Sequence, residues 1–164
     1  MKSITMGKGL EEDYILIRSY NSSDYPTTLE LLKELYDSYD IGLKEGQWIA
    51  SSGLRQFKPN FKRETLIAEL KSTKEVVGMG VIEALRNHLG NYTGYLNNWA
   101  IKKELIGKSM GKHLADKAIQ ILKSWGCDSI RINLDYNVPE KLIKVFGIAG
   151  FQPILVVLEK RFED

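Results

Sequence analysis

The stretch that decides the fold is KKELIGKSMGKH, residues Lys102–His113. It contains two glycines, one serine and four lysines, and it lies between an apolar run typical of a strand and an amphipathic run typical of a helix. At the start of a helix several backbone N–H groups have no partner, and the helix dipole is positive. The composition therefore suits an anion with several charged oxygens, such as a pyrophosphate, and it suits equally well a tight turn with solvated lysines.

The spacing of this loop excludes the common nucleotide motifs. The phosphate loop of nucleotide hydrolases needs G-x-x-x-x-G-K-[ST]. Counted from Gly107, the next glycine, Gly111, comes one residue early, and His113 stands where the magnesium-binding hydroxyl belongs. With Ser109 as that hydroxyl, the pattern needs a glycine where the chain has Lys102. The dinucleotide pattern G-x-G-x-x-G is absent as well.

Composition is that of an ordinary globular protein of 164 residues with a net charge of +2, too small to indicate nucleic-acid binding by itself. We expect a loose lead-in at residues 1–12 and one domain at 13–164. No run of 18 apolar residues predicts a membrane span, and the first residues lack the apolar core of a signal peptide. Together with the single Cys127, this predicts a cytoplasmic protein without a metal site.

The periodicity of apolar residues predicts the order β-α-loop-β-β-β-α-β-α-β. This order predicts a mixed α/β (α+β) fold with a mostly antiparallel sheet flanked by helices. The expected strands are 14–20, 64–70, 75–85, 92–101, 127–135 and 151–162, and the expected helices are 21–39, 111–126 and 137–150.

Residues 40–63 form a long, glycine-interrupted connection in which we expect one or two short helices. Long loops of this kind are often lids or binding loops, and a variable surface insertion explains the composition equally well.

The loop and its surroundings resemble the GNAT superfamily of N-acetyltransferases, whose pyrophosphate loop reads [RQ]-x-x-G-x-[GA]. Ile106 falls at the arginine or glutamine position, Ser109 at the first glycine and Gly111 at the second. The segment AGF at 149–151 resembles the closing segment of that family, with Phe146 at the tyrosine position. This chain departs from the pattern because Ile106 has no side-chain donor and Ser109 carries a Cβ.

The resemblance implies acetyl-CoA as acyl donor. It implies that the backbone of residues 106–111 holds the pyrophosphate and that the exposed backbone of Trp99 to Ile101 pairs with the pantetheine arm like an added strand. The cofactor-binding residues implied in this way are Trp99, Ala100, Ile101, Ile106, Gly107, Lys108, Ser109, Met110, Gly111, Lys112 and Asn137.

The implied reaction is direct attack of a primary amine, whose identity stays open, on the thioester. An amine is protonated at neutral pH, so a base is needed, and we expect Glu83 to act as base or to position a water. Phe146 cannot donate a proton, so Tyr136 is the nearest replacement as general acid, with Asp135 as a further candidate. A solvated strand carboxylate and a packing tyrosine are the ordinary alternatives for Glu83 and Tyr136.

Two other functions stay open. A protein that binds or senses acyl-CoA without transferring the acyl group would use the same fold, and the missing tyrosine favours it. A helix-turn-helix DNA-binding module is the third reading, but the strand pattern at 92–101 argues against it, and so nucleic acid is not the expected partner. An open sheet edge near the C-terminal strand would allow a homodimer.

Overall fold

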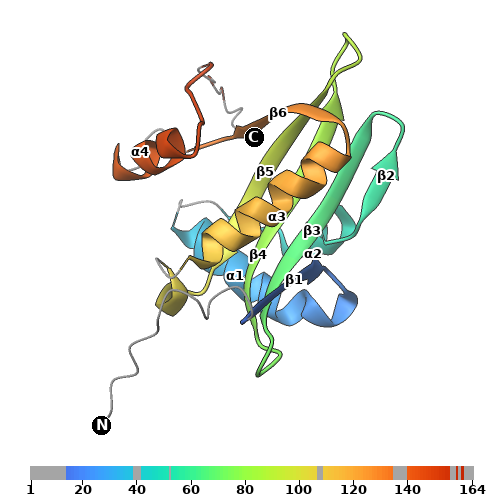
Figure 1. Ribbon diagram of the computed structural model, residues 1–164. Coiled ribbons are helices and arrows are strands. Elements are labelled where there is room, and N and C mark those ends of the chain that lie inside the picture. Colours follow the sequence, from blue (N-terminus) through green and yellow to red (C-terminus); the bar gives the residue numbers. More distant parts are fainter. Residues whose placement is uncertain are drawn as a thin grey trace. The chain divides into compact units, whose positions relative to one another are not determined.

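The computed structural model of the chain describes residues 14–38, 42–51, 53–106, 109–134, 140–155, 158 and 160 (Figure 1). The chain divides into two compact units, Met1–Asn133 and Leu134–Asp164. Each unit is described by itself. The lead-in expected at residues 1–12 lies outside the described residues.

The first unit is built on a six-stranded sheet. Five strands follow the order β1-β3-β4-β5-β6, and the sixth, β2, pairs with β3. All pairs are antiparallel except β5 with β6, which is parallel. The predicted mixed, mostly antiparallel sheet flanked by helices is therefore confirmed. The strands are β1 (Ile15–Ser19), β2 (Gln56–Lys58), β3 (Phe61–Leu70), β4 (Val76–Arg86), β5 (Tyr92–Ile101) and β6 (Cys127–Ile132).

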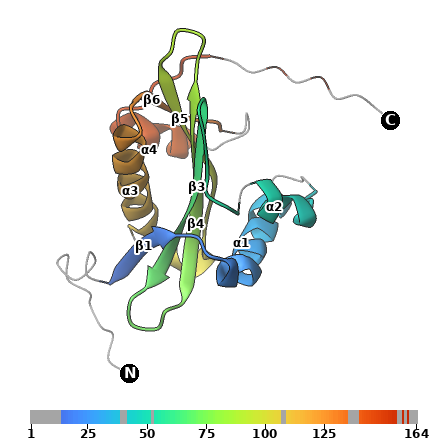
Figure 2. The ribbon, with the colours of Figure 1, turned by 90° about the vertical axis from the view of Figure 1, so that its right-hand side faces the viewer.

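Helices cover both faces of this sheet. Figure 2 shows the sheet edge-on, with α1 (Tyr25–Asp37) and α2 (Glu45–Ser51) on one side and α3 (Met110–Ser124) on the other. Short 3-10 turns, η1 (Ser22–Asp24) and η2 (Lys103–Leu105), precede α1 and follow β5. We call the two sides of the sheet the α1 face and the α3 face.

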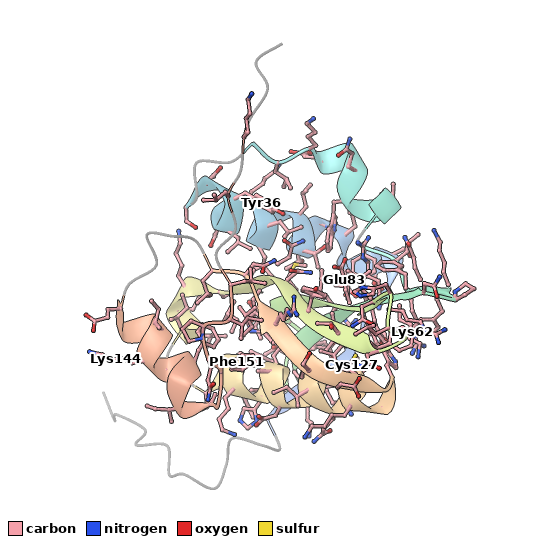
Figure 3. The ribbon with its side chains drawn as sticks, turned by 90° about the horizontal axis from the view of Figure 1, so that it is seen from above. Tyr36, Lys62, Glu83, Cys127, Lys144 and Phe151 are labelled. Atoms are coloured by element: carbon pink, nitrogen blue, oxygen red, sulfur yellow. The ribbon has the colours of Figure 1, made fainter. Side chains whose placement is uncertain are left out.

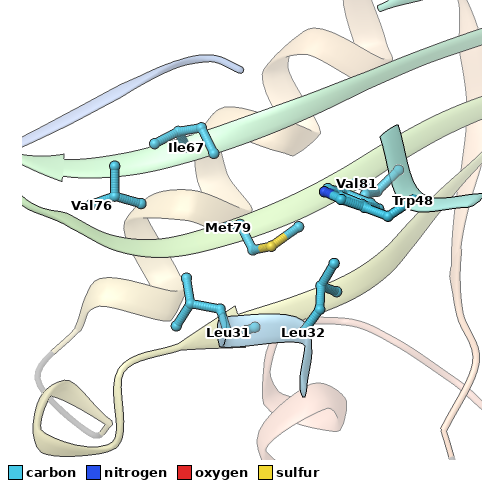
Figure 4. Close-up of a cluster of buried hydrophobic side chains, with 8 residues drawn as sticks. Leu31, Leu32, Trp48, Ile67, Val76, Met79 and Val81 are labelled. Carbon is cyan, nitrogen blue, oxygen red and sulfur yellow. The ribbon is translucent and has the colours of Figure 1, made fainter. Parts of the chain in front are cut away.

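The start of α1 is fixed by local hydrogen bonds. The side chain of Asn21 accepts a bond from the backbone N–H of Ser23, and the carboxylate of Asp24 accepts one from the N–H of Asn21. Thr28, Leu31 and Leu32 are then buried at the i, i+3, i+4 spacing of one helical face. The two leucines belong to a buried hydrophobic cluster on the α1 face (Figure 4) whose members are Leu31, Leu32, Trp48, Ile67, Val76, Met79, Val81 and Ala100.

The α3 face has its own core. Leu114, Ala118 and Leu122 recur along one side of α3 and are fully buried against the sheet. Ile130 and Ile132 of β6 pack against the same cluster. Alternate residues of the strands therefore belong to opposite faces of the sheet. This alternation decides which side chains share the face of the candidate site.

The predicted elements are mostly confirmed, with two corrections. The connection at 40–63 contains the short helix α2, as expected, but also the strand β2, and β3 begins at Phe61 rather than at residue 64. In the second unit, α4 (Glu140–Ile148) confirms the expected helix.

The expected closing strand at 151–162 is wrong for the residues that the structure describes there, 151–155, 158 and 160, none of which is in a strand. The apolar alternation is present, but a strand needs a neighbouring strand for its backbone groups, and the sheet ends at β6. The homodimer expected through this strand stays a prediction. None of the helices that the structure describes has the length and apolar character needed to cross a membrane.

Candidate active site

The open part of β5 is the first element of the site. Its pairing with β6 runs only from Tyr92 to Leu96, which lies opposite Ile132, whereas its pairing with β4 continues to Ile101. From Asn97 to Ile101 one edge of β5 therefore pairs with no described strand. Its backbone N–H and C=O groups can accept an extended ligand as an added strand.

A β-bulge lies at the start of this open part. Val81 on β4 pairs with Asn97, and Met79 pairs with Ala100, so β5 has one residue more than β4 between the two pairs. Asn98 has a positive φ of 48°. Because of the extra residue, the side chains of Asn97 and Asn98 both lie on the α1 face instead of alternating.

The bulge is held by hydrogen bonds from neighbouring elements. The hydroxyl of Tyr36, on α1, donates to Oδ1 of Asn98 at 3.0 Å. The amide of Asn97 donates from Nδ2 to Oε2 of Glu83 on β4 at 2.9 Å. Tyr36 and Glu83 are both labelled in Figure 3. Two polar contacts thus orient the bulge toward the α1 face.

Glu83 is half-buried and held on both carboxylate oxygens. Arg63 donates from Nε to Oε1 at 2.5 Å and forms an ion pair with the same oxygen through Nη2. Asn97 occupies Oε2. The carboxylate therefore stands in a fixed orientation beside the bulge, as a group that accepts a proton or positions a water must.

Glu83 belongs to a row of side chains across four strands. The register pairs Arg63 with Glu83, Glu83 with Tyr95, and Tyr95 with Arg131. Residues directly opposite each other point to the same face of a sheet. All four side chains are half-buried, and the row lies on the α1 face.

A cavity of about 260 Å³ adjoins the bulge on the same face. Its walls come from α1, from the connection after it, from α2 and from β5, so the long connection expected to be a binding loop does line a cavity. Four lining residues are apolar or aromatic, and none is acidic. The lining residues are Leu32, Tyr36, Gly42, Leu43, Lys44, Gln47, Trp48 and Asn98.

The N-terminus of α3 is the third part of the site. Ser109 precedes the helix with a positive φ of 61°, and the N–H of His113 bonds the carbonyl of Ser109 at 3.1 Å. The N–H groups of the first two helical residues, Met110 and Gly111, lie in the first turn, where an α-helix offers its N–H groups no acceptor of its own. They are the donors that the sequence predicted for an anion.

Gly111 brings this helix end against the open part of β5. A Cβ at Gly111 would lie 3.3 Å from Cδ1 of Ile101. Met110 anchors the first turn, since it is 3% exposed and packs against Ala68 and Val77. The edge of β5 that pairs with no described strand therefore adjoins the N-terminus of α3.

The lysines of the loop contribute less positive charge than the sequence suggested. Three of the four are paired with carboxylates in the described structure, and the hydrogen bond from Lys102 to Glu75 raises the pKa of that lysine. The pairs are Lys102 with Glu75 at 2.6 Å, Lys103 with Glu34 at 3.9 Å and Lys112 with Asp116 at 2.6 Å. The backbone N–H groups and the helix dipole therefore provide most of the attraction for an anion here.

The remaining residues expected at the site fall into three groups. Trp99 turns its indole to the α3 face, where a Cβ at Gly80 would come within 2.4 Å of the ring, and Ala100 is buried in the α1-face core. Ile106 is exposed, so it offers its backbone alone. Five expected residues lie outside the described residues, namely Gly107, Lys108, Asp135, Tyr136 and Asn137.

Sequence reasoning missed most of the side chains around Glu83. One signal was available: the dipeptide Asn97-Asn98 interrupts a strand, where asparagine is disfavoured, and such an interruption is typical of a bulge. No local pattern brings Arg63, Arg131 or Tyr36 to the same place, because the sheet register and the packing of α1 do so.

Burial accounts for the single cysteine. Burial raises the pKa of the Cys127 thiol, and the residue packs against the α3-face core, where it lies close to Gly94. The thiol is therefore mostly protonated at neutral pH and poorly suited to act as a nucleophile.

Comparison with known proteins agrees with this geometry. The sequence model of the acetyltransferase (GNAT) family matches residues 27–151. The chain therefore belongs to the GNAT acetyltransferase family. No curated protein matches it.

Solved structures share the fold at low sequence identity. An acetyltransferase from Trypanosoma brucei aligns with a TM-score of 0.68 at 18% identity, over 90% of this chain and 99% of that one. Glucosamine-6-phosphate N-acetyltransferase from Arabidopsis thaliana gives 0.66 at 17% identity, over 91% and 99%. An aminoglycoside acetyltransferase from an uncultured soil sample, in complex with sisomicin, gives 0.70 at 13% identity, over 92% and 98%. At these identities the likeness establishes the fold and leaves the acceptor open.

Proposed function

We propose that this chain is an N-acetyltransferase that transfers the acetyl group of acetyl-CoA to a primary amine by direct attack. The observation that carries the proposal is the edge of β5 from Asn97 to Ile101, which pairs with no described strand and adjoins the N-terminus of α3. Family membership supports the reaction class. The proposal places the protein in the cytoplasm, as its sequence predicts.

The residues present fit acetyl-CoA. The N–H groups of Met110 and Gly111 would bind its pyrophosphate, the open edge of β5 would pair with its pantetheine arm, and Lys112 stays a prediction as a further contact. Acetyl-CoA supplies an activated acetyl thioester. Gly107, Lys108 and Asn137 stay predictions as further contacts.

Glu83 has the position of a base in this scheme. Its carboxylate is oriented by Arg63 and Asn97 and stands beside the bulge where the open part of β5 begins. It would accept a proton from the ammonium group of the acceptor, directly or through a water, so that the neutral amine can attack the thioester. Tyr136 stays a prediction as the general acid.

The cavity beside the bulge is the entry that we propose for the acceptor. It opens between α1, α2 and β5, on the same face as Glu83. The solved relatives carry names with unlike acceptors, an aminoglycoside and an amino-sugar phosphate, so the family alone does not choose between them.

The test is thermal melting with and without acetyl-CoA, on the wild type and on Gly111→Glu, which adds bulk and negative charge to the first turn of α3. Ligand at about a hundred times its dissociation constant stabilises the wild type by about 2.7 kcal/mol. Gln120→Glu is the matched control, since it adds the same charge to an exposed site on the same helix. We expect the shift in the wild type and the control and its loss in Gly111→Glu.

A well-folded wild type that acetyl-CoA does not stabilise would contradict the proposal. A second candidate, binding of acyl-CoA without transfer, is favoured by Phe146, whose ring packs edge-on against Phe151 at 5.8 Å and has no proton to donate. Release of free CoA in the presence of any primary amine, above the rate without amine, excludes that candidate.

A further inference from the structure

We propose that the amine acceptor carries an anionic group, a carboxylate or a phosphate, that binds Arg131 at the end of the row formed with Tyr95 and Glu83. The inference rests on the proposed transferase function and names the class of its acceptor. It is carried by the placement of Arg131, by its unmet hydrogen-bonding capacity and by the charges around the bulge.

Arg131 faces the same side of the sheet as Glu83. Its neighbours in β6, Ile130 and Ile132, pack into the α3-face core, so the side chain between them points to the α1 face. The register gives the same result, because Arg131 pairs with Tyr95 and Tyr95 pairs with Glu83. An acceptor beside Glu83 therefore has Arg131 within its reach.

One nitrogen of the Arg131 guanidinium has unmet hydrogen-bonding capacity. Its Nε is buried and makes no hydrogen bond within the described part of the chain, while the side chain as a whole is half-buried. Glu83, the carboxylate in the row, already binds Arg63. A buried donor without a partner is costly, and a ligand oxygen would satisfy it with a charge-assisted hydrogen bond.

The charges around the bulge favour an acid over a second amine. The row contains two arginines and one glutamate, and the cavity adds the exposed Lys44 and no carboxylate. A polyamine would place an extra cation against this surface, which costs free energy at close range. An acceptor with one amine and one anionic group matches the surplus positive charge.

The spacing of the strands sets the form of the acceptor. Glu83 and Arg131 lie two strands apart, and two strand spacings amount to about 10 Å. The aromatic ring of Tyr95 lies between them in the row and offers an apolar surface. The amine and the acid are thus separated by an aliphatic or flat spacer that lies over Tyr95.

The experiment compares four probes, each an amine on a six-carbon chain: aminohexanoate, aminohexyl phosphate, hexylamine and hexamethylenediamine. Thermal melting gives the concentration of each probe needed for a fixed shift, with and without CoA. We expect one of the two acids to reach that shift at a concentration at least about tenfold below that of hexylamine, the size of one charge-assisted hydrogen bond. The better acid distinguishes carboxylate from phosphate.

Three variants locate the effect. Arg131→Gln should remove the preference for acids, and Arg131→Lys should keep part of it. Arg86→Gln is the control, since Arg86 is exposed on another part of the sheet, where it bonds the carbonyl of Gly90. We expect the control to retain the wild-type preference.

The proposal is overturned if neither acid binds better than hexylamine, or if the preference survives in Arg131→Gln. A lower melting temperature in Arg131→Gln with an unchanged preference would assign Arg131 a purely structural role and overturn it too. The acetyl-CoA test stands apart from these probes. If the wild type binds acetyl-CoA but prefers no acid, the transferase proposal stands and this acceptor class is wrong. If it prefers acids but does not bind acetyl-CoA, both the transferase proposal and the acceptor role are overturned.

Discussion

Glu83 is the residue on which the proposed chemistry depends most. Replacing it with glutamine keeps the shape but removes the base, so we expect kcat to fall by about 10²–10⁴-fold, the usual contribution of a general base. Glu45→Gln is a control, because Glu45 forms an exposed ion pair with Lys33 and is not among the residues that line the cavity. Steady-state transfer rates to an amine substrate measure the effect. An unchanged kcat in Glu83→Gln would leave Glu83 a structural partner of Arg63.

Ser109 occupies a conformation that favours glycine. A left-handed backbone costs a residue with a Cβ about 1–2 kcal/mol, and glycine avoids most of that cost. Because glycine also has more freedom in the unfolded chain, we expect Ser109→Gly to stabilise the protein by a smaller net amount, about 0.5 kcal/mol. Denaturant unfolding measures it.

Ser124→Gly is the opposite control for this prediction. Ser124 lies in the last turn of α3, where glycine is unfavourable by about 1 kcal/mol, and its hydroxyl bonds the carbonyl of Ile121. A destabilised Ser109→Gly would show that the serine side chain makes a contact that outweighs its backbone strain.

At the scale of elements, β5 shows what the sequence could and could not predict. Its bounds agree with the expected 92–101, because alternation and β-branched or aromatic residues are local signals. The bulge and the end of pairing at Leu96 depend on how far β6 extends alongside, which no local pattern contains.

The segment at 151–155 shows the same limit of local sequence patterns, here as a strand that was predicted and does not form. Apolar residues at 151–155 satisfy the strand pattern, yet these residues form no strand. Periodicity reports which side chains alternate and carries no information about whether a neighbouring backbone is present. The start of α3 was better predicted, at residue 111 against the observed Met110, since the signals at a helix end act within a few residues.

The contact between β4 and β5 yields a prediction at this scale. A Cβ at Gly80 would lie 2.4 Å from the ring of Trp99, far inside contact distance. We expect Gly80→Ala to displace Trp99 and destabilise the protein by about 1–3 kcal/mol, the usual cost of overpacking. Because Trp99 belongs to the open part of β5, the binding of acetyl-CoA should weaken as well.

Two further variants make this prediction specific. In Gly46→Ala the new Cβ meets nothing within 4 Å, and Gly46 is in α2, so that variant should be as stable as the wild type or more so. The double variant Gly80→Ala, Trp99→Leu should lose less stability than the two single losses added together. Strict additivity would mean that the two side chains do not compete for the same space.

At the scale of the whole first unit, a network around Arg18 joins three elements. Arg18 on β1 bonds both carboxylate oxygens of Asp24 in η1, at 2.7 and 2.8 Å, and bonds Glu69 on β3 at 2.8 Å. Asp24 is 4% exposed. The network ties the edge of the sheet to the start of α1, and α1 in turn holds the bulge through Tyr36.

This network predicts how stability depends on pH. Burial opposes the ionisation of Asp24, but hydrogen bonds from Arg18 and from the backbone of Asn21 outweigh it and hold the pKa of Asp24 below its ordinary value. In the unfolded chain an aspartate titrates near pH 4. The stabilisation is therefore fully present above about pH 4 and is lost as pH falls through the lower pKa of the folded state. Asp24→Asn should lose about 3 kcal/mol at pH 7, because it leaves Arg18 partly unpaired, and should show a shallower loss of stability in acid.

Denaturant unfolding from pH 7 down to pH 3 measures both parts of this prediction. Asp116→Asn is the matched control, since its ion pair with Lys112 is exposed and spans one helical turn. Such pairs contribute about 0.3–0.5 kcal/mol, so the control should follow the wild type closely. Equal acid slopes in Asp24→Asn and the wild type would show that other carboxylates govern the acid unfolding.

A loss of α1 anchoring in Asp24→Asn should also disturb the candidate site, because Tyr36 on α1 bonds Asn98 at the bulge. We therefore expect weaker binding of acetyl-CoA by Asp24→Asn than by the wild type at pH 7.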